Sequence, residues 1–321
     1  MKYFVVTFGC QMNVSDSERI GLMLSKKYKP ASSIKEADLI VVNMCSVRQP
    51  AVDRVYGLIP KLKNKKTILT GCILKKDKLK LAKIFDEIKE PEELIKTFQS
   101  VSGLIPIMRG CNNFCSYCVV PFTRGREVSR PAEKIVCEAK KLVRKGVEEI
   151  WLLGQNVNSY KYNFPELLRE LNKIPGKFLI KFTSSHPKDF SDDLIKAMKE
   201  CKKVAKYLNL PVQSGDDVIL KKMNRPYTAK QYKNLVKKIR KEIPNIILST
   251  DIIVGFPGET KKQFENTKKL FKQVQFDMAY ISKYSPRYGT AAEKLKDNVS
   301  PQEKKRREKL LEKIIKSKYE K

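Results

Sequence analysis

The sequence predicts an α/β protein in two parts. The first is a parallel sheet covered by helices, and the second is a set of six β/α units that curl into an incomplete barrel. Short apolar runs typical of strands lie at 3–8, 37–43 and 66–70, and a second series starts at residue 104. Amphipathic stretches separate the runs in both series. Because alternating strands and helices build parallel sheets, these two observations predict the fold class.

The N-terminal part is expected to occupy residues 1–100. Between its strand runs lie SDSERIGLMLSKKY and AVDRVYGLIPKLK, whose apolar residues recur at helical spacing. The charge-rich stretch 75–100 predicts a helix that bridges to the second part.

The second part is expected to occupy residues 101–300, followed by a basic helix at 301–321. Its six predicted strands lie at 104–108, 149–153, 178–184, 207–212, 246–256 and 278–284. Six β/α units form an incomplete barrel, whose functional loops follow the carboxyl ends of the strands.

Composition narrows the class of protein. Of the 321 residues 41% are hydrophobic, which is enough for a packed core. The net charge of +31 indicates a polyanionic partner such as nucleic acid, although lysines on ordinary helix faces would also produce it. No apolar stretch approaches a membrane span, and the N-terminus lacks the features of a signal peptide. We therefore expect a cytoplasmic protein with no membrane partner, in which clustered cysteines bind metal or carry out redox chemistry.

The stretch RGCNNFCSYCVVPFTRG holds three cysteines at C-x3-C-x2-C spacing: Cys111, Cys115 and Cys118. Structural zinc takes four ligands, and catalytic zinc usually includes histidine or a carboxylate, whereas His186 is the only histidine here. Iron–sulfur clusters are held by thiolates, normally four. Three thiolates on a 4Fe–4S cluster leave one iron open to bind a small molecule.

Three more cysteines form a second predicted site. Cys10, Cys45 and Cys72 each follow the end of a predicted strand, in TFGC, VNMC and TGC. Parallel strands in a βαβ array end at the same edge, and neighbours are ~4.8 Å apart, so the three thiols converge. The alternative is three buried cysteines that act as small hydrophobic residues.

The remaining cysteines are not expected to be ligands. Cys201 shares a helix face with Leu194 and Met198 and is expected in the core, whereas Cys137 is expected to be exposed. Three arginines that follow the triplet, Arg124, Arg126 and Arg130, suggest an anionic substrate brought to the metal.

Several stretches of the chain resemble the radical S-adenosylmethionine (SAM) methylthiotransferases. They are FGCQMNVSDSE, NMCSVR, CNNFCSYCVVPFTRGREVSRP, LLGQNVNSY, TSSHP, LPVQSG, MNRPYT, STDIIVGFPGET and YSPRYGTAA. Within that family the match is densest to the tRNA-2-methylthio-N6-dimethylallyladenosine synthases. The resemblance implies a flavodoxin-like sheet domain followed by a partial (β/α)6 radical SAM barrel. The family usually continues into a tRNA-binding β-barrel called TRAM, which we do not expect in this chain.

The resemblance also implies the chemistry. Cys111, Cys115 and Cys118 would hold a 4Fe–4S cluster that binds SAM and cleaves it to a 5′-deoxyadenosyl radical. That radical would abstract the C2 hydrogen of N6-isopentenyl-adenosine beside a tRNA anticodon. The other three cysteines would hold a second 4Fe–4S cluster, which carries the sulfur for insertion after methylation by another SAM.

By the same resemblance, Tyr117 would pack near the adenine of SAM. The loops that complete the SAM pocket would contribute Gly154, Gln155, Asn156, Gln213, Ser214 and Gly255. His186 would either line this pocket or make a structural hydrogen bond, and Arg225 would meet a phosphate or face solvent.

The expected partners are the tRNA anticodon stem-loop, a one-electron donor such as flavodoxin or ferredoxin, and a sulfur source, and we expect a monomer. Two related substrates stay open, namely threonylcarbamoyl-adenosine in tRNA and an aspartate of a ribosomal protein. An alternative of another class is a non-catalytic, zinc-containing nucleic-acid-binding protein.

Overall fold

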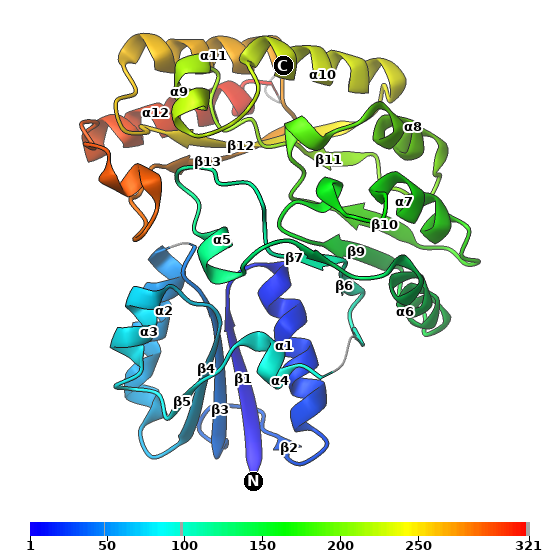
Figure 1. Cartoon of the computed structure of the whole chain (residues 1–321), viewed down its shortest axis with the longest axis vertical. Coiled ribbons are helices and arrows are strands. Elements are labelled where there is room, and N and C mark those ends of the chain that lie inside the picture. Colours follow the sequence, from blue (N-terminus) through cyan, green and yellow to red (C-terminus); the bar gives the residue numbers. More distant parts are fainter. Residues whose placement is uncertain (48, 97–98, 319–321) are drawn as a thin grey trace. The chain divides into compact units, whose positions relative to one another are not determined.

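The computed structural model describes residues 1–47, 49–96 and 99–318. The chain divides into two compact units (Figure 1). The first comprises residues 1–112 and 119–153, and the second comprises residues 113–118 and 154–321. Each unit is described by itself.

The first unit is built on a five-stranded sheet with strand order β2-β1-β3-β4-β5. Its strands are β1 (Lys2–Phe8), β2 (Lys29–Pro30), β3 (Leu39–Cys45), β4 (Lys66–Cys72) and β5 (Glu87–Ile88). Every neighbouring pair is parallel. This order is the flavodoxin-like arrangement, so the predicted fold of the N-terminal part is confirmed.

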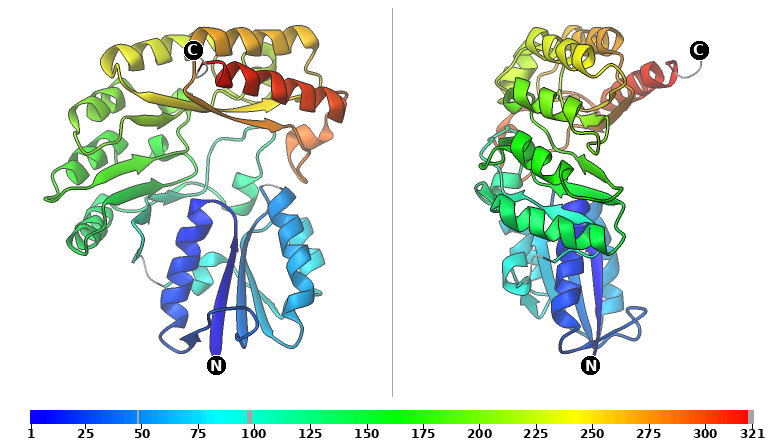
Figure 2. Two further views of the ribbon diagram at one scale, coloured as in Figure 1. Left: turned by 180° about the vertical axis from the view of Figure 1, so that it is seen from behind. Right: turned by 90° about the vertical axis from the view of Figure 1, so that its right-hand side faces the viewer.

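Helices cover both faces of this sheet, as the two views in Figure 2 show. They are α1 (Gln11–Leu24) on one face, and α2 (Gln49–Leu58), the 3-10 turn Ile59–Leu62 and α3 (Lys75–Leu81) on the other. Strand β3 is buried along its whole length, and Ile40, Val42 and Met44 pack with Val52 and Val55 of α2. An uninterrupted apolar run buried on both faces is typical of a central parallel strand.

The predicted single helix over 75–100 is wrong. Helix α3 ends at Leu81, β5 follows, and α4 (Pro91–Leu94) is one short turn. The short strand pairs Glu87 with Ile68 and Ile88 with Leu69, which closes the sheet on the β4 side. Backbone pairing at the sheet edge outweighs the helical preference of the charged side chains.

The rest of the first unit carries the start of the second strand series. It contains β6 (Leu104–Pro106), β7 (Met108–Arg109), α5 (Val120–Thr123), β8 (Val128–Ser129), α6 (Ala132–Arg144) and β9 (Glu149–Leu153). Strands β6 and β9 are parallel, with Leu104 opposite Trp151, and β7 and β8 form a small antiparallel pair. Ser15 of α1 donates a hydrogen bond to the Leu104 carbonyl oxygen at 3.0 Å, which ties β6 to α1.

The second unit continues the series with alternating strands and helices. Its strands are β10 (Leu179–Phe182), β11 (Tyr207–Asn209), β12 (Ile247–Val254) and β13 (Met278–Lys283), and β12 pairs in parallel with both β11 and β13. Its helices are α7 (Phe164–Asn172), α8 (Asp192–Glu200), α9 (Asp217–Lys222), α10 (Ala229–Glu242), α11 (Lys261–Val274) and α12 (Pro301–Lys316), and its 3-10 turns are Val157–Ser159, Pro187–Asp189 and Ala291–Lys294. All six predicted strands of the series are therefore present.

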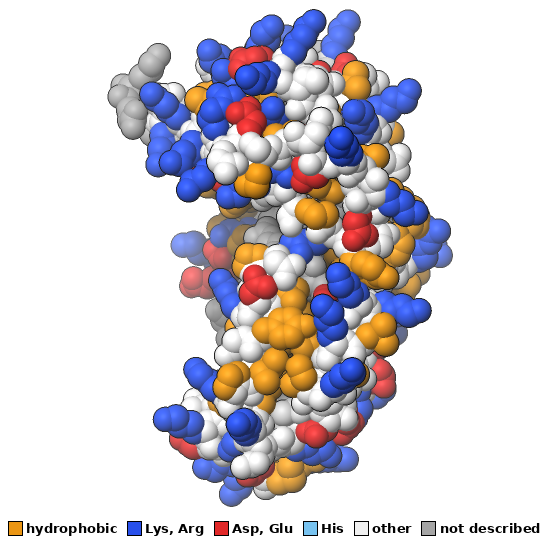
Figure 3. Space-filling view, turned by 90° about the vertical axis from the view of Figure 1, so that its left-hand side faces the viewer, with side chains coloured by type: hydrophobic (Ala, Val, Ile, Leu, Met, Phe, Trp, Pro, Cys, Tyr) orange, Lys and Arg blue, Asp and Glu red, His pale blue; other side chains and the backbone are white. Residues whose placement is uncertain are grey.

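Helices of the second unit pack against each other in chain order, from α7 to α8, α10, α11 and α12. The basic helix α12 lies on β13 and is fixed by buried charge: Arg307 pairs with Glu259 at 2.6 Å, and the two side chains are 3% and 1% exposed. Figure 3 shows Lys and Arg side chains spread over the visible face with Asp and Glu among them. In the described part of the chain, no helix is long and apolar enough to cross a membrane.

Candidate active site

Cys45 and Cys72 are the last residues of neighbouring strands and are direct partners in the β3–β4 register. Cys10 lies two residues beyond β1, whose last residue, Phe8, is opposite Met44 on β3. The three cysteines therefore meet at the carboxyl edge of the sheet, as the sequence predicts. Cys45 and Cys72 are buried, whereas Cys10 is exposed at the start of α1.

A buried amide pair organises this edge. Asn13 Oδ1 accepts hydrogen bonds from the Cys10 nitrogen and the Cys10 thiol at 3.2 and 3.4 Å. Its Nδ2 donates to Asn43 Oδ1 at 2.9 Å and lies 4.0 Å from Cys72 Sγ. Asn43 Nδ2 donates back to the Asn13 carbonyl oxygen at 2.8 Å. One side chain thus contacts sulfurs from two of the three strand ends.

Two glycines leave room for this pair. A Cβ on Gly9 would overlap the side chain of Asn13. Gly71 has φ +112°, and a Cβ there would overlap the Met44 carbonyl oxygen. Both glycines directly precede a cysteine, in FGC and TGC, so the close approach fixes where each thiol lies.

Arg124 contributes a buried guanidinium group to the same edge. Its Nε donates to Cys72 Sγ at 2.8 Å, and its Nη2 lies 2.8 Å from Asp16 Oδ2. The hydrogen bond from Cys45 and the nearby charge of Arg124 lower the pKa of the Cys72 thiol, while the same bond to Cys72 raises the pKa of Cys45. A thiol with a lowered pKa ionises readily, and the thiolate is the form that binds metal.

The suggestion that three arginines bring an anionic substrate to the triplet is wrong for two of them. Arg124 is 5% exposed and turned to Cys72 and Asp16. Arg130 is 11% exposed and bonds to Glu138 and to the Pro106 carbonyl oxygen. Arg126 is exposed.

The C-x3-C-x2-C loop runs from the end of β7 to the start of α5. Cys111 is buried, and its nitrogen donates to the Gly125 carbonyl oxygen at 3.1 Å. The Cys118 nitrogen donates to the Cys115 carbonyl oxygen at 3.0 Å. Ser116 bonds through its nitrogen to the Met223 carbonyl oxygen and through Oγ to that of Lys222, at 3.0 and 2.7 Å. These bonds fix residues 113–118 onto the end of α9.

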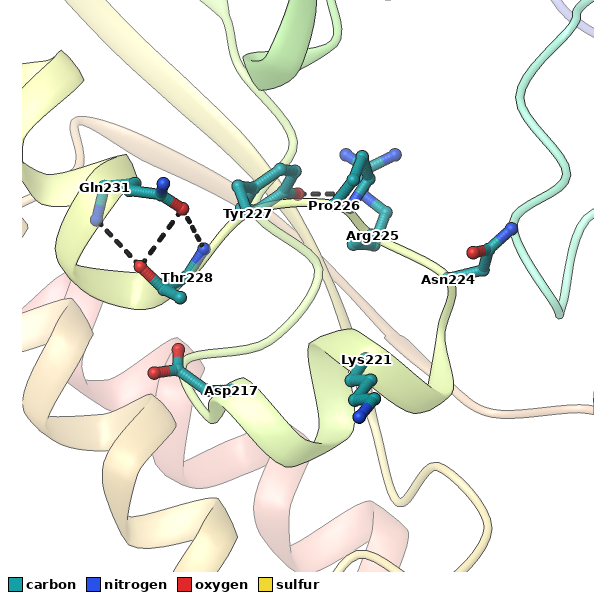
Figure 4. A pocket seen from close by; sticks show the side chains of 8 residues that line it. All are labelled: Asp217, Lys221, Asn224, Arg225, Pro226, Tyr227, Thr228 and Gln231. Carbon is teal, nitrogen blue, oxygen red and sulfur yellow. Dashed lines mark hydrogen bonds between the residues drawn. The ribbon is translucent and has the colours of Figure 1, made fainter.

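Tyr117 of this loop is half-buried against Ile219, Met223, Phe256 and Tyr284. Arg225, which follows α9, is buried and does not face solvent. Its Nη1 lies 3.6 Å from Cys115 Sγ, and its Nε donates to the Tyr227 hydroxyl at 2.7 Å. Arg225 and Tyr227 are among the residues that line a pocket of about 430 Å³, and Figure 4 shows their side chains close to each other.

Loops of the second unit carry buried polar atoms without hydrogen-bond partners among the described residues. They are Gln155 Oε1, Asn156 Oδ1, Ser185 Oγ, His186 Nε2 and Gln213 Oε1. Leaving a buried polar group unpaired costs about 1–3 kcal/mol. These five atoms lie on the loops at the carboxyl ends of the strands, where they are available to a polar partner.

His186 makes a structural hydrogen bond through one ring nitrogen, and its other ring nitrogen, Nε2, has no hydrogen-bond partner among the described residues. Its Nδ1 accepts from the Lys188 nitrogen at 3.2 Å, so the proton of the neutral ring is on Nε2. Burial lowers the pKa of His186 to about 2, and the charges of Arg225 and Lys188 act in the same direction.

The other predicted SAM-pocket residues have varied surroundings. Ser214 is buried and accepts from the Asp216 nitrogen at 3.2 Å, and Gly154 follows β9 directly. Gly255 has φ +68°, and the space beside it is filled by the Lys304 side chain of α12, which a Cβ would overlap. The geometry thus supplies a local structural reason for this glycine.

Comparisons with known proteins agree with this geometry. Residues 105–271 match the Radical SAM superfamily, and residues 2–90 match the uncharacterized protein family UPF0004. The chain is 43% identical to the tRNA-2-methylthio-N(6)-dimethylallyladenosine synthase of Clostridium novyi, over 93% of this chain and 77% of that protein. The synthase of Acetivibrio thermocellus is also 43% identical, over 97% of this chain and 75% of that protein. The chain belongs to the radical SAM family that includes these two synthases.

Solved structures support the fold alone. The radical SAM methyltransferase TsrM from Kitasatospora setae superposes with a TM-score of 0.68 at 14% identity, over 91% of this chain and 77% of TsrM. The radical SAM enzyme OxsB superposes with a TM-score of 0.60 at 11% identity, over 99% of this chain and 55% of OxsB. The predicted fold class, a flavodoxin-like domain followed by a radical SAM barrel, is confirmed.

The donor sets at both sites fit iron–sulfur clusters of this family. The predicted ligands of each site are three cysteine thiols, and neither set includes a histidine or a carboxylate. Within the described residues, no three His, Cys, Asp or Glu side chains are grouped to hold a metal ion. The cysteine ligands of an iron–sulfur cluster bind different iron atoms. Their sulfurs therefore need not converge on one point, as the ligands of a single zinc ion do. Cys201 is buried and Cys137 is exposed, as predicted for cysteines outside the two sites.

Proposed function

We propose that this protein is a radical SAM methylthiotransferase that adds a methylthio group to C2 of N6-isopentenyl-adenosine next to the tRNA anticodon. The observation that carries the proposal is the combination of two three-cysteine sites in one member of the synthase family. In this account, Cys111, Cys115 and Cys118 hold one 4Fe–4S cluster, and Cys10, Cys45 and Cys72 hold the other. When bound, two SAM molecules would supply the methyl group and the radical, and the second cluster would supply the sulfur.

The protein's own residues position and shield this chemistry. Tyr117, Gly154, Gln155, Asn156, Gln213, Ser214 and Gly255 are proposed to bind SAM. The unpaired atoms of Gln155, Asn156 and Gln213 support that role, because a polar ligand would satisfy them. A C2–H of adenine is not acidic, so the reaction needs no side chain that acts as a general base.

The remaining assignments follow from the reaction. We propose the anticodon stem-loop of tRNA as the macromolecular partner, with a one-electron donor of the flavodoxin or ferredoxin type and a separate sulfur source. We also propose that the protein is cytoplasmic, as expected for an enzyme that acts on tRNA, and that it is a monomer. Residues 1–100 would carry the second cluster, 101–300 the SAM-cleaving barrel, and 301–321 a basic helix.

The test is to incubate reconstituted protein with SAM, reductant and isopentenylated tRNA, and to digest the tRNA for mass analysis. The proposal predicts the methylthio-modified nucleoside together with 5′-deoxyadenosine. Threonylcarbamoylated tRNA and a ribosomal-protein substrate, run in parallel, should stay unmodified. Modification of either one in place of isopentenylated tRNA would transfer the assignment to that substrate.

Cysteine variants separate the roles of the two sites. Cys115→Ala should abolish formation of 5′-deoxyadenosine. Cys45→Ala should retain it and lose the methylthio product. Cys137→Ala, at an exposed thiol outside both sites, is the matched control and should keep both. Equal loss of both products in Cys45→Ala and Cys115→Ala would contradict the division of roles.

A further inference from the structure

Each three-cysteine site has one sulfur that accepts a hydrogen bond from a buried arginine. At the first-unit site, Arg124 Nε lies 2.8 Å from Cys72 Sγ. At the loop site, Arg225 Nη1 lies 3.6 Å from Cys115 Sγ. Arg124 and Arg225 lie in the stretches PFTRG and MNRPYT, 52 and 110 residues away from the cysteines whose sulfurs they contact.

The two guanidinium groups differ in how their charge is compensated. Arg124 pairs with the Asp16 carboxylate at 2.8 Å, and the two side chains are 5% and 7% exposed. The net charge of this ion pair beside Cys72 Sγ is therefore close to zero.

Arg225 is held by uncharged groups. Besides Cys115, its partners in the described residues are the Tyr227 hydroxyl and the Pro211 carbonyl oxygen, each at 2.7 Å. Its guanidinium group also lies 5.3 Å from the centre of the Tyr227 ring. A guanidinium group is not deprotonated in proteins, so Arg225 keeps its positive charge in this buried position.

We propose that Arg124 and Arg225 are positioning residues that set the reduction potentials of the two clusters, with the uncompensated charge of Arg225 making the SAM-binding cluster the easier one to reduce. Hydrogen bonds to cluster sulfurs and net charge nearby are two main determinants of cluster potential. A positive charge in a water-poor site stabilises the reduced cluster, which carries one more electron. The step concerned is a one-electron reduction by a low-potential donor, in which no bond forms or breaks.

This inference rests on the proposed function, because it assumes that the cysteines hold 4Fe–4S clusters. The test is a redox titration of the holoprotein with dithionite and mediators, followed by electron paramagnetic resonance (EPR). The signal of the SAM-binding cluster is identified by its change when SAM is added. Iron and acid-labile sulfide are measured first in each variant, and their absence from the wild type would contradict the proposed function itself.

Arg225→Gln should shift the potential of the SAM-binding cluster to more negative values, and Arg225→Lys, which keeps the charge, should shift it less. Lys221→Gln is the matched control, since it removes an exposed charge on α9 beside the same pocket (Figure 4). Loaded clusters with no shift in Arg225→Gln, or with an equal shift in Lys221→Gln, would overturn the proposal and leave the proposed function intact.

The pair at the other site allows a test in both directions. Asp16→Asn should shift the second cluster to more positive values, because it removes the compensating negative charge, whereas Arg124→Gln should shift it to more negative values. The double variant leaves no buried charge unpaired and serves if Arg124→Gln alone does not fold. Its potential should lie between those of the two single variants. Potentials that do not differ among these variants would overturn the assignment for Arg124.

Discussion

Asn13 and Asn43 form a buried reciprocal amide pair between α1 and β3, with Nδ2 of each donating to the other residue at 2.9 and 2.8 Å. The pair lies between the thiols of Cys10 and Cys72. Residues that join a ligand-bearing helix start to a ligand-bearing strand in this way hold the ligands in position before a cluster binds.

The isosteric change Asn13→Asp tests this role. It keeps the shape and the acceptor oxygen but removes the donor to Asn43 Oδ1 and to the Met44 carbonyl oxygen, at a cost of about 1–3 kcal/mol for each buried acceptor left unpaired. We expect iron per reconstituted chain to fall from about eight to about four, as one of two four-iron clusters is lost. Unchanged iron and sulfide would show that the amide pair does not organise the cysteines.

Gly71→Ala should destabilise the first unit. Its φ of +112° is unfavourable for a side chain, at about 1–3 kcal/mol, and the added Cβ would overlap the Met44 carbonyl oxygen. Gly57→Ala in α2 is the control, because a Cβ there meets nothing within 4 Å and alanine favours a helix by about 0.5–1 kcal/mol. Urea unfolding of the apo chain measures both, and equal stability of the two variants would contradict the role given to Gly71.

His186 should be neutral, with its proton on Nε2, across the range in which histidines usually titrate. It is the only histidine, so ¹⁵N NMR of an untagged, histidine-labelled chain reports on it alone. With a folded pKa of about 2 against about 6.5 when unfolded, the group contributes stability that is complete above pH 6.5 and is lost as the pH falls below it. A titration midpoint near pH 6.5 in the folded protein would be the contrary result.

Arg307→Ala should destabilise the second unit by about 3–5 kcal/mol, because it leaves Glu259 buried and unpaired. Glu259 also accepts a hydrogen bond from the Gly255 nitrogen at 2.7 Å, so the loop predicted to bind SAM should lose order as well. Arg306, the residue before Arg307, also pairs with Glu303 but is 51% exposed. Arg306→Ala should therefore lower the free energy of unfolding by less than about 1 kcal/mol. Similar decreases in the free energy of unfolding in the two variants, measured in urea, would contradict the importance of the buried Arg307–Glu259 pair.

The sequence predicts the parts of the fold and site that depend on local pattern. The strand ends that carry Cys10, Cys45 and Cys72 could be located because apolar runs mark buried strands, and topology then brings their ends together. The segment 75–100 reads as a helix in sequence, whereas the pairing of Glu87 and Ile88 with β4 is a tertiary contact that leaves no periodic pattern.

The arginines that contact the cysteine sulfurs cannot be predicted from local pattern either, because their contacts are also tertiary. Arg124 and Arg225 contact sulfurs 52 and 110 residues away in the chain, and no spacing rule links them. The motif GCQMNVSDSE carries the one signal that was available, since polar residues on a helix beside a buried strand require partners. Asn13, Ser15 and Asp16 of that motif are indeed buried and bonded.

Metal analysis of four reconstituted proteins tests whether each cysteine trio holds its own iron–sulfur cluster. We predict about eight irons and about eight sulfides per chain in the wild type and in Cys137→Ala, and about four of each in Cys72→Ala and in Cys115→Ala. Stoichiometric zinc without sulfide, or about four irons in the wild type, would contradict it.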